Sequence, residues 1–251
     1  MCLILFAYKI DPSYPLIVAA NRDEFYQRPT RRLDFWPDAP GLLAGQDLEQ
    51  GGTWLGCTRS GRFAAVTNVR QGFSQTGTQL KSRGHLPLDY LLGNQPPLDY
   101  LRALESQSHH YAGYNLLLGD RHGLYYGSNR NQQPPQELAP GIYGLSNATL
   151  DTPWPKVTQG TRALQQLIEA DDISAPALLR LLQHRELPTD EQLPDTGIGL
   201  EWERRLSPRF IDSNDYGTRS SLVMLREQDG RQQVYEQSYS PHWEKPKSYS
   251  F

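Results

Sequence analysis

Short apolar runs, joined in pairs by turn residues, alternate along the chain with segments of helical periodicity. Turn sequences such as Asp11-Pro12 and Ser60-Gly61 lie between paired runs and predict antiparallel hairpins. The predicted strands span residues 2–9, 16–20, 53–58, 63–69, 114–119, 124–127, 141–146, 219–226 and 232–239. The predicted helices span about 86–92, 98–104, 153–170 and 174–182. Residues 188–199 are polar and rich in Pro and Gly, and we expect a surface excursion there.

The order of these blocks is strands, helices, strands, helices, strands, without the strict alternation of a doubly wound parallel fold. Hairpin-joined strands with segregated helices predict an α+β fold. Two strand blocks and two helix blocks fit two antiparallel sheets covered by helices on their outer faces. No linker-like stretch divides the 251 residues, so we expect one domain over residues 1–251.

Composition narrows the functional classes. Hydrophobic residues make up 37% and the net charge is -3, which fits a globular chain and gives nucleic-acid binding no support. The two cysteines do not form a disulfide framework, and a reducing cytoplasm is the simplest location. The apolar run Leu3–Tyr8 is too short to span a bilayer, and the six histidines lack metal-ligand spacing. We therefore expect neither a transmembrane segment nor a metal site.

Cys2, directly after Met1, is the first candidate for chemistry. Initiator methionine is usually removed before a small residue, which would leave a thiol and an α-amine on one residue. Their pKa values lie near ~8.5 and ~8, so a nucleophile and its base would coincide. The alternative is that Cys2 is a small buried strand residue.

Further polar residues follow predicted strands. The first hairpin would bring Asn21-Arg22-Asp23-Glu24 beside Cys2, where Asp23 could hold the α-ammonium and Arg22 could lower the thiol pKa. Asn68 lies at the end of a predicted strand and Asn147 follows another. Asn at such positions is either a turn former or a donor to an oxyanion. Arg219 opens the last hairpin. The segment Gly51–Gly56, which carries Trp54, lacks the ending of a phosphate loop.

Taken in order, these segments resemble the NRDE family, also called the transport-and-Golgi-organisation protein 2 family. The resemblance spans nearly the whole chain. It rests on Met-Cys-Leu-Ile at the N-terminus, Asn21-Arg22-Asp23-Glu24, Gly51-Gly52-Thr53-Trp54-Leu55-Gly56, Ala65-Val66-Thr67-Asn68-Val69-Arg70, Ser82-Arg83-Gly84, Gly144-Leu145-Ser146-Asn147 and Tyr216-Gly217-Thr218-Arg219-Ser220-Ser221.

The family is similar to N-terminal nucleophile hydrolases of the choloylglycine and penicillin V acylase type. That similarity implies a four-layer αββα sandwich, with two antiparallel sheets between helical layers. It implies catalytic roles for Cys2 as nucleophile, Asp23 at its amine, Asn68 and Asn147 at the substrate carbonyl, and Arg219 near the thiol. The acylases' other arginine lies just before their Asp with slightly different spacing, so Arg22 departs from the family pattern at that place.

Two functions follow from the resemblance, which also links the family to Golgi organisation, haem mobilisation and acyl-CoA or lipid handling. The first is a cysteine amidohydrolase that cleaves carbon–nitrogen amide bonds of a small substrate. The second is a non-catalytic binding or trafficking protein for hydrophobic anions such as haem or acyl-CoA. Asn21, Arg22, Trp54 and Arg70 are the candidate ligand-binding residues. We expect no required cofactor, with haem as a possible bound ligand.

Overall fold

The structure is a computed structural model that describes residues 2–72, 80–239 and 244–251, without the side chain of Cys2. Met1 lies outside the described residues. The strands are β1 (Cys2–Tyr8), β2 (Leu16–Phe25), β3 (Thr30–Trp36), β4 (Ala39–Asp47), β5 (Leu55–Thr58), β6 (Phe63–Asn68), β7 (Tyr114–Gly119), β8 (Leu124–Ser128), β9 (Gln136–Glu137), β10 (Gly141–Leu145), β11 (Tyr216–Arg226), β12 (Gln232–Ser238) and β13 (Lys247–Ser250). The helices are α1 (His85–Leu92), α2 (Pro97–Glu105), α3 (Pro155–Glu169), α4 (Ala175–Leu182) and α5 (Leu200–Arg205), with short 3-10 turns at Ser108–His110 and Asp190–Gln192.

The chain forms two compact units. The first unit comprises Met1–Gln27, Arg70–Ser74 and Pro140–Phe251, and the second comprises Arg28–Val69 and Gln75–Ala139. Each unit contains one sheet in which every strand pairs antiparallel to its neighbours.

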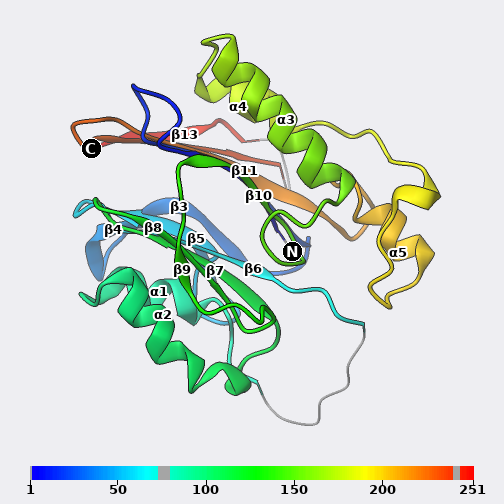
Figure 1. Ribbon diagram of the computed structural model, residues 1–251, viewed down its shortest axis with the longest axis horizontal. Coiled ribbons are helices and arrows are strands. Elements are labelled where there is room, and N and C mark those ends of the chain that lie inside the picture. Colours follow the sequence, from blue (N-terminus) through cyan, green and yellow to red (C-terminus); the bar gives the residue numbers. More distant parts are fainter. Residues whose placement is uncertain (1, 73–79, 240–243) are drawn as a thin grey trace. The chain divides into compact units, whose positions relative to one another are not determined.

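The first unit holds a six-stranded sheet in the order β10-β1-β2-β11-β12-β13. Helices α3 and α4 cover one face of it (Figure 1). Alternate residues of the central strands, such as Leu3, Leu5 and Val223, pack against these helices because successive strand side chains point to opposite faces. A Cβ on Gly160 would lie 2.7 Å from the Leu5 side chain, so glycine lets α3 approach the sheet closely.

The second unit holds a seven-stranded sheet in the order β3-β4-β5-β6-β7-β8-β9, with α1 and α2 on one face. A Cβ on Gly52 would lie 2.4 Å from the backbone carbon of Gly84, and the Thr53 amide donates to the Gly84 carbonyl at 3.0 Å. The glycines of the Gly51–Gly56 and Ser82-Arg83-Gly84 segments therefore allow two backbones to pack closely together, and do not form a phosphate-binding loop.

Every predicted strand and helix is present, but several boundaries differ and several elements were missed. β2 continues through Phe25, so Asn21, Arg22 and Asp23 are buried residues within the strand rather than residues that follow it. α3 begins at Pro155 with Trp154 as its N-cap, two residues later than the predicted start near residue 153. The elements that the pattern did not predict are β3, β4, β9, β13 and α5.

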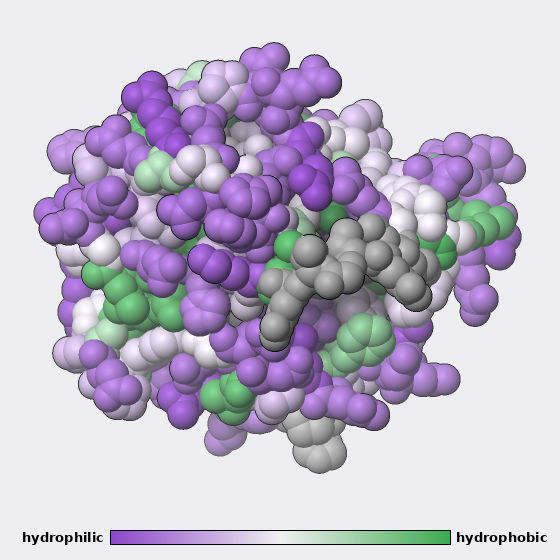
Figure 2. All heavy atoms as spheres, turned by 90° about the horizontal axis from the view of Figure 1, so that it is seen from below, coloured by the Kyte–Doolittle hydropathy of each residue, from purple (hydrophilic) through white to green (hydrophobic). Residues whose placement is uncertain are grey.

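In the described residues, no helix is long and apolar enough to cross a membrane. Large exposed hydrophobic side chains are few among them and come from separate parts of the sequence. The face in Figure 2 is mostly hydrophilic, with small groups of hydrophobic residues between the polar ones.

Candidate functional site

Two of the sequence motifs pair with each other in the first sheet. The register of β2 against β11 places Asn21 opposite Ser221, Arg22 opposite Ser220 and Asp23 opposite Thr218. All six side chains are buried. A register shift between Thr218 and Ser220 leaves Arg219 on a bulge, and bulges re-aim side chains. The pairing concentrates buried polar groups at one end of the sheet.

Cys2 begins β1 at that same end, and its backbone pairs with Arg22. Its side chain, the predicted nucleophile, lies outside the description. On the other side of β1, Leu145 of β10 pairs with Ile4, and the strands run antiparallel. Asn147, two residues beyond Leu145, therefore lies at the end of the sheet where β1 begins, and it is fully buried.

Asp23 is buried beneath this end of the sheet. Thr218 Oγ1 donates to Asp23 Oδ1 at 2.7 Å, and the Ile211 amide donates to the same hydroxyl at 2.9 Å. Burial raises the pKa of Asp23 above its ordinary value, and the positive charge of Lys156 opposes that shift. Burial therefore disfavours the ionised form of Asp23, and any further positive charge nearby would stabilise that form.

Arg22 and Arg219 bring two positive charges to this end of the sheet, where the carboxylate of Glu24 also acts on Arg219. Burial lowers the pKa of Arg219, and the positive charge of Arg22 lowers it further, so the two guanidinium groups act on each other electrostatically. Arg219 Nη1 donates to the Phe25 carbonyl at 3.0 Å. Two neighbouring cations favour an anion or a thiolate beside them.

Arg70 and Glu203 form a buried ion pair at 2.5 Å, with side chains only 4% and 3% exposed. Burial lowers the pKa of Arg70, and Glu203 opposes that effect. Thr196 fixes the carboxylate, because its amide and its Oγ1 donate to Glu203 Oε1 at 2.8 and 2.6 Å. The Arg70 guanidinium lies 4.8 Å from the ring of Trp154.

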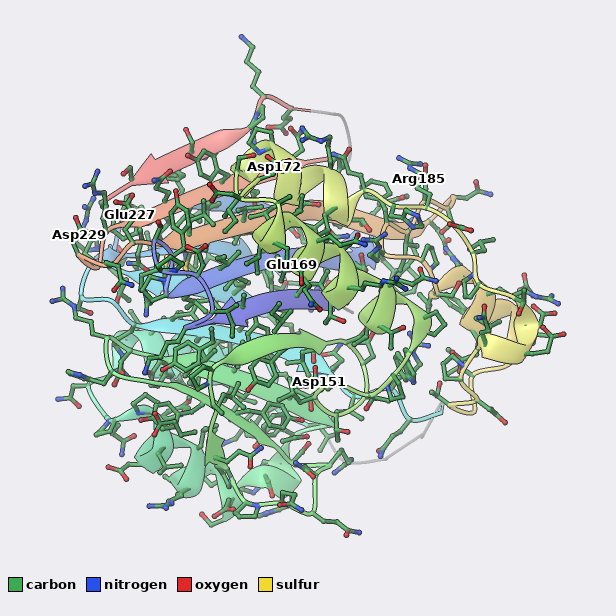
Figure 3. All side chains as sticks on the ribbon, turned by 45° about the horizontal axis from the view of Figure 1, so that its top comes forward. Asp151, Glu169, Asp172, Arg185, Glu227 and Asp229 are labelled. Atoms are coloured by element: carbon green, nitrogen blue, oxygen red, sulfur yellow. The ribbon has the colours of Figure 1, made fainter. Side chains whose placement is uncertain are left out.

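The loop that carries Asn147 is closed at its base. Gly144 N donates to Asp151 Oδ1 at 2.8 Å, and Asp151 N donates to the Gly144 carbonyl at 2.9 Å. Figure 3 shows Asp151 where the chain passes from β10 to α3. Arg70 N donates to the Asn147 carbonyl at 2.7 Å and fixes the loop from its other side. The loop is thus closed across its own ends, and its Asn147 backbone is bonded to the segment that carries Arg70.

Asn21 joins the strand to α4. Its Nδ2 donates to the carbonyls of Leu182 and Arg209 at 3.0 and 2.7 Å, and its Oδ1 accepts from Ser221 Oγ at 2.5 Å. Arg209 Nη1 donates to the Leu181 carbonyl at 2.9 Å, so both last carbonyls of α4 have a side-chain partner. These bonds engage both ends of the Asn21 amide within the protein.

Sequence reasoning missed three residues of this cluster: Lys156, Glu203 and Thr218. Lys156 Nζ donates to the Leu206 carbonyl at 2.9 Å and is buried. Thr218 could have been found, because it lies inside the matched Tyr216–Ser221 segment. Lys156 and Glu203 had no local signal, because each is brought to the site by contacts distant in sequence.

Residues 203–211 follow the predicted surface excursion and line the cluster. Four side chains from separate parts of the first unit form hydrogen bonds with this segment. They are Lys156 of α3, Arg70 of the chain after β6, Asn21 of β2 and Thr218 of β11. The predicted polar stretch 188–199 is largely exposed, whereas Glu203 and residues 206–211 are buried. The predicted surface excursion over residues 188–199 is therefore confirmed, and the buried residues that line the cluster begin beyond it.

Asn68 and Trp54 belong to the second unit. Asn68 is the last residue of β6, is partly buried and pairs with Tyr114 of β7. Trp54 packs flat on Gly45, where a Cβ would lie 2.3 Å from the ring. Within their unit, Asn68 is a strand-end residue and Trp54 a packing anchor. Among the described residues, no group of three His, Cys, Asp or Glu side chains is arranged to hold a metal ion.

Comparisons with known proteins agree with the sequence resemblance. A sequence model of the family described as Transport and Golgi organisation 2 matches residues 1–241. The Transport and Golgi organization protein 2 homolog of Bos taurus is 38% identical over 263 residues, covering 95% of this chain and 93% of the bovine protein. The Homo sapiens homolog is 36% identical over 280 residues, covering 100% of this chain and 99% of the human protein.

Among solved structures, a Caenorhabditis elegans N-acylethanolamine-hydrolyzing acid amidase ortholog is similar with a TM-score of 0.52 at 11% identity, covering 89% of this chain and 92% of the amidase. At that identity the match shows the fold alone. It confirms the predicted class, an N-terminal nucleophile hydrolase-like α+β fold with two antiparallel sheets and helical layers.

Proposed function

The chain belongs to the Transport and Golgi organisation 2 family, and from that premise we propose that it is an N-terminal cysteine amidohydrolase acting on a small amide. The observation that carries the proposal is the charged cluster at the start of β1. Arg22 pairs with Cys2 across the strands, and Asp23 lies buried next to it in sequence. Such a cluster costs folding free energy, because buried charges lose hydration. A reaction at Cys2 gives it a use.

In the proposed reaction, removal of Met1 frees the α-amine of Cys2. The amine accepts the thiol proton, and the thiolate attacks the amide carbonyl carbon. The C–N bond breaks as the ammonium returns that proton to the leaving amine, which leaves a thioester on Cys2. A water molecule, deprotonated by the same amine, then adds to the thioester, releasing a carboxylic acid and restoring the thiol.

The surrounding residues have matching roles in this proposal. Asp23 holds the α-ammonium, while Arg22 and Arg219 stabilise the thiolate. Asn147 donates to the carbonyl oxygen as it becomes an oxyanion, a contribution of about 10²–10³ in rate for one donor. The corresponding role of Asn68 rests on the family resemblance. A cytoplasmic location, consistent with the low cysteine content, is part of the same proposal.

The test compares wild type with Cys2→Ala on a panel of N-acyl amides, with amine release as the readout and intact mass as the check that Met1 is absent. We expect release by wild type and none by Cys2→Ala. Cys57→Ala is the matched control, because Cys57 is the buried cysteine of the second unit and should be dispensable. Activity that survives Cys2→Ala, or full retention of Met1 in active protein, overturns the mechanism.

A second function is supported by the charge balance of the cluster. Its buried cations are Arg22, Arg70, Lys156, Arg209 and Arg219, against the carboxylates of Asp23 and Glu203. A binding protein for a hydrophobic anion, such as haem or an acyl-CoA, would use that surplus without any reaction. Titration of haem and of a long-chain acyl-CoA into wild type and Arg219→Ala tests it, and equal affinities for both proteins would exclude the anion role of Arg219.

A further inference from the structure

Two arginines elsewhere in this chain donate hydrogen bonds to a carboxylate from both Nε and Nη2, which lie on one edge of the guanidinium group. Arg28 donates from both atoms to Asp47 Oδ2, at 3.0 and 2.8 Å. Arg204 donates from both atoms to the two carboxylate oxygens of Asp190, at 2.7 and 2.5 Å. This two-pronged contact is the geometry in which arginine binds carboxylate and phosphate groups.

Arg70 presents the same edge without a protein acceptor. Its Nη1 is bonded to Glu203, whereas Nε and Nη2 are buried and have no hydrogen-bond partner among the residues that the structure describes. Buried donors of this kind are rare in native proteins, because each costs folding free energy when it is left unmet. An oxygen-bearing ligand on this edge would supply the missing acceptors.

The Arg70 edge is also held in a fixed direction. Glu203 fixes one side of the guanidinium, and the Trp154 ring lies 4.8 Å from its centre. The Arg70 backbone amide donates to the Asn147 carbonyl. A group bound to this edge therefore lies close to the loop that carries the proposed oxyanion donor.

The charges around Arg70 suit an anion. Glu203 balances Arg70 itself, and the other buried ions of the cluster described above are Arg22, Lys156, Arg209 and Arg219 against Asp23. An added negative charge therefore meets a positive surplus. Neutral acceptors would fill the two hydrogen bonds but would gain nothing from that surplus.

We propose that the Nε–Nη2 edge of Arg70 binds an oxyanion, a carboxylate or a phosphate, on the substrate, so that the preferred amide joins an acyl group to an anionic amine such as an amino acid. The turnover measurement in the test rests on the proposed hydrolase function, whereas the anion preference of Arg70 is tested by binding alone. Arg70 is then a specificity-determining residue, and a neutral ethanolamide is a poor substrate.

Matched amides test the proposal. N-octanoylglycine, N-octanoylethanolamine and the phosphate monoester of the latter share one acyl chain and differ in the group beyond the nitrogen. Binding is measured by calorimetry on Cys2→Ala, and amine release is measured on wild type. We expect an anionic probe to bind about tenfold to a hundredfold more tightly than the ethanolamide, the range typical of a charged hydrogen-bonded contact. The tighter of the two anionic probes identifies the source of the oxyanion.

Three variants separate specificity from folding. Arg70→Gln combined with Glu203→Gln keeps the pair neutral and similar in shape, and we expect it to bind all three probes alike. Arg70→Lys keeps the charge without the fork and should lose most of the preference. Arg204→Gln, a neighbouring exposed arginine, should keep the full preference. Circular dichroism confirms that each variant is folded.

The outcomes distinguish this proposal from the function on which it rests. Equal binding of the glycine and ethanolamine amides by the folded protein, or a preference that survives the double variant, overturns the role of Arg70. A preference in binding without any turnover supports the Arg70 subsite and refutes the hydrolase. Turnover without a preference supports the hydrolase and refutes the subsite.

Discussion

Replacing Glu203 with alanine should destabilise the protein strongly, although the residue lies on the short helix α5 far from the N-terminus in sequence. The substitution removes the acceptor for Arg70 at 2.5 Å and for two donors of Thr196. Both charged side chains are at least nine-tenths buried, so Arg70 would remain as a buried cation without its carboxylate.

The cost follows from that burial. Removing one partner of a buried ion pair typically costs about 3–5 kcal/mol, because the other charge stays desolvated. Arg70→Met should cost a similar amount for the same reason. The double variant removes both charges, so its loss should be smaller than the sum of the two, with a coupling of about 2 kcal/mol or more.

Urea unfolding followed by far-UV circular dichroism measures all three variants. The adjacent residue supplies a matched control, because Arg204 pairs with Asp190 in an exposed bridge, and Arg204→Gln should leave the urea midpoint nearly unchanged. If Glu203→Ala does not fold, Glu203→Gln removes the charge at a lower cost in packing. Losses that simply add, or a Glu203 variant as stable as the Arg204 control, would refute the reasoning.

Three further predictions concern the frame of the site and of the second unit. Burial raises the pKa of Asp23, so its contribution to stability is present below the unfolded pKa and lost as pH rises through the folded value. Asp23→Asn should therefore gain stability relative to wild type as the pH rises above about 4, the pKa of an unfolded Asp, and a constant difference in urea midpoint would contradict this. Gly52→Ala should cost about 1–3 kcal/mol, because its Cβ would lie 2.4 Å from Gly84, whereas Gly41→Ala, with nothing within 4 Å, should be neutral. Asn21→Ala should cost about 2–3 kcal/mol and speed hydrogen exchange at the end of α4, and unchanged exchange there would exclude the capping role.

Local patterns were sufficient for the hairpins and four helices, because turn residues and period-two alternation are both local signals. They failed for β3, where only Leu33 of seven residues is buried and the others are mostly charged or polar. They also failed for the second half of β2. Four consecutive polar residues predict a loop, and pairing with the polar residues of β11 allows the first three, Asn21, Arg22 and Asp23, to be buried in a strand.

The site was predictable to the extent that strand pairing determines it. A hairpin between β1 and β2 places Cys2 opposite Arg22 whatever the rest of the chain does. The strand that carries Arg219 was predicted from its hairpin, but no local pattern indicates which strand it pairs with. Only the family resemblance placed Arg219 near Cys2. Lys156 and Glu203 were beyond reach, because their neighbours are set by how α3 and α5 pack, and a single sequence does not encode that in any short motif.

The Asn-Arg-Asp-Glu segment therefore divides by physical role. Asn21 makes its bonds to α4 and β11, which stabilise the fold whether or not a ligand is present. Arg22 and Asp23 instead place charge at the start of β1, where burial costs free energy and gives the fold nothing that an apolar pair would not give better. A carrier and a hydrolase would both use that charge. They differ at Cys2, because only the hydrolase needs a free α-amine beside the thiol, and so the state of the N-terminus decides between them more directly than any variant of the surrounding cluster.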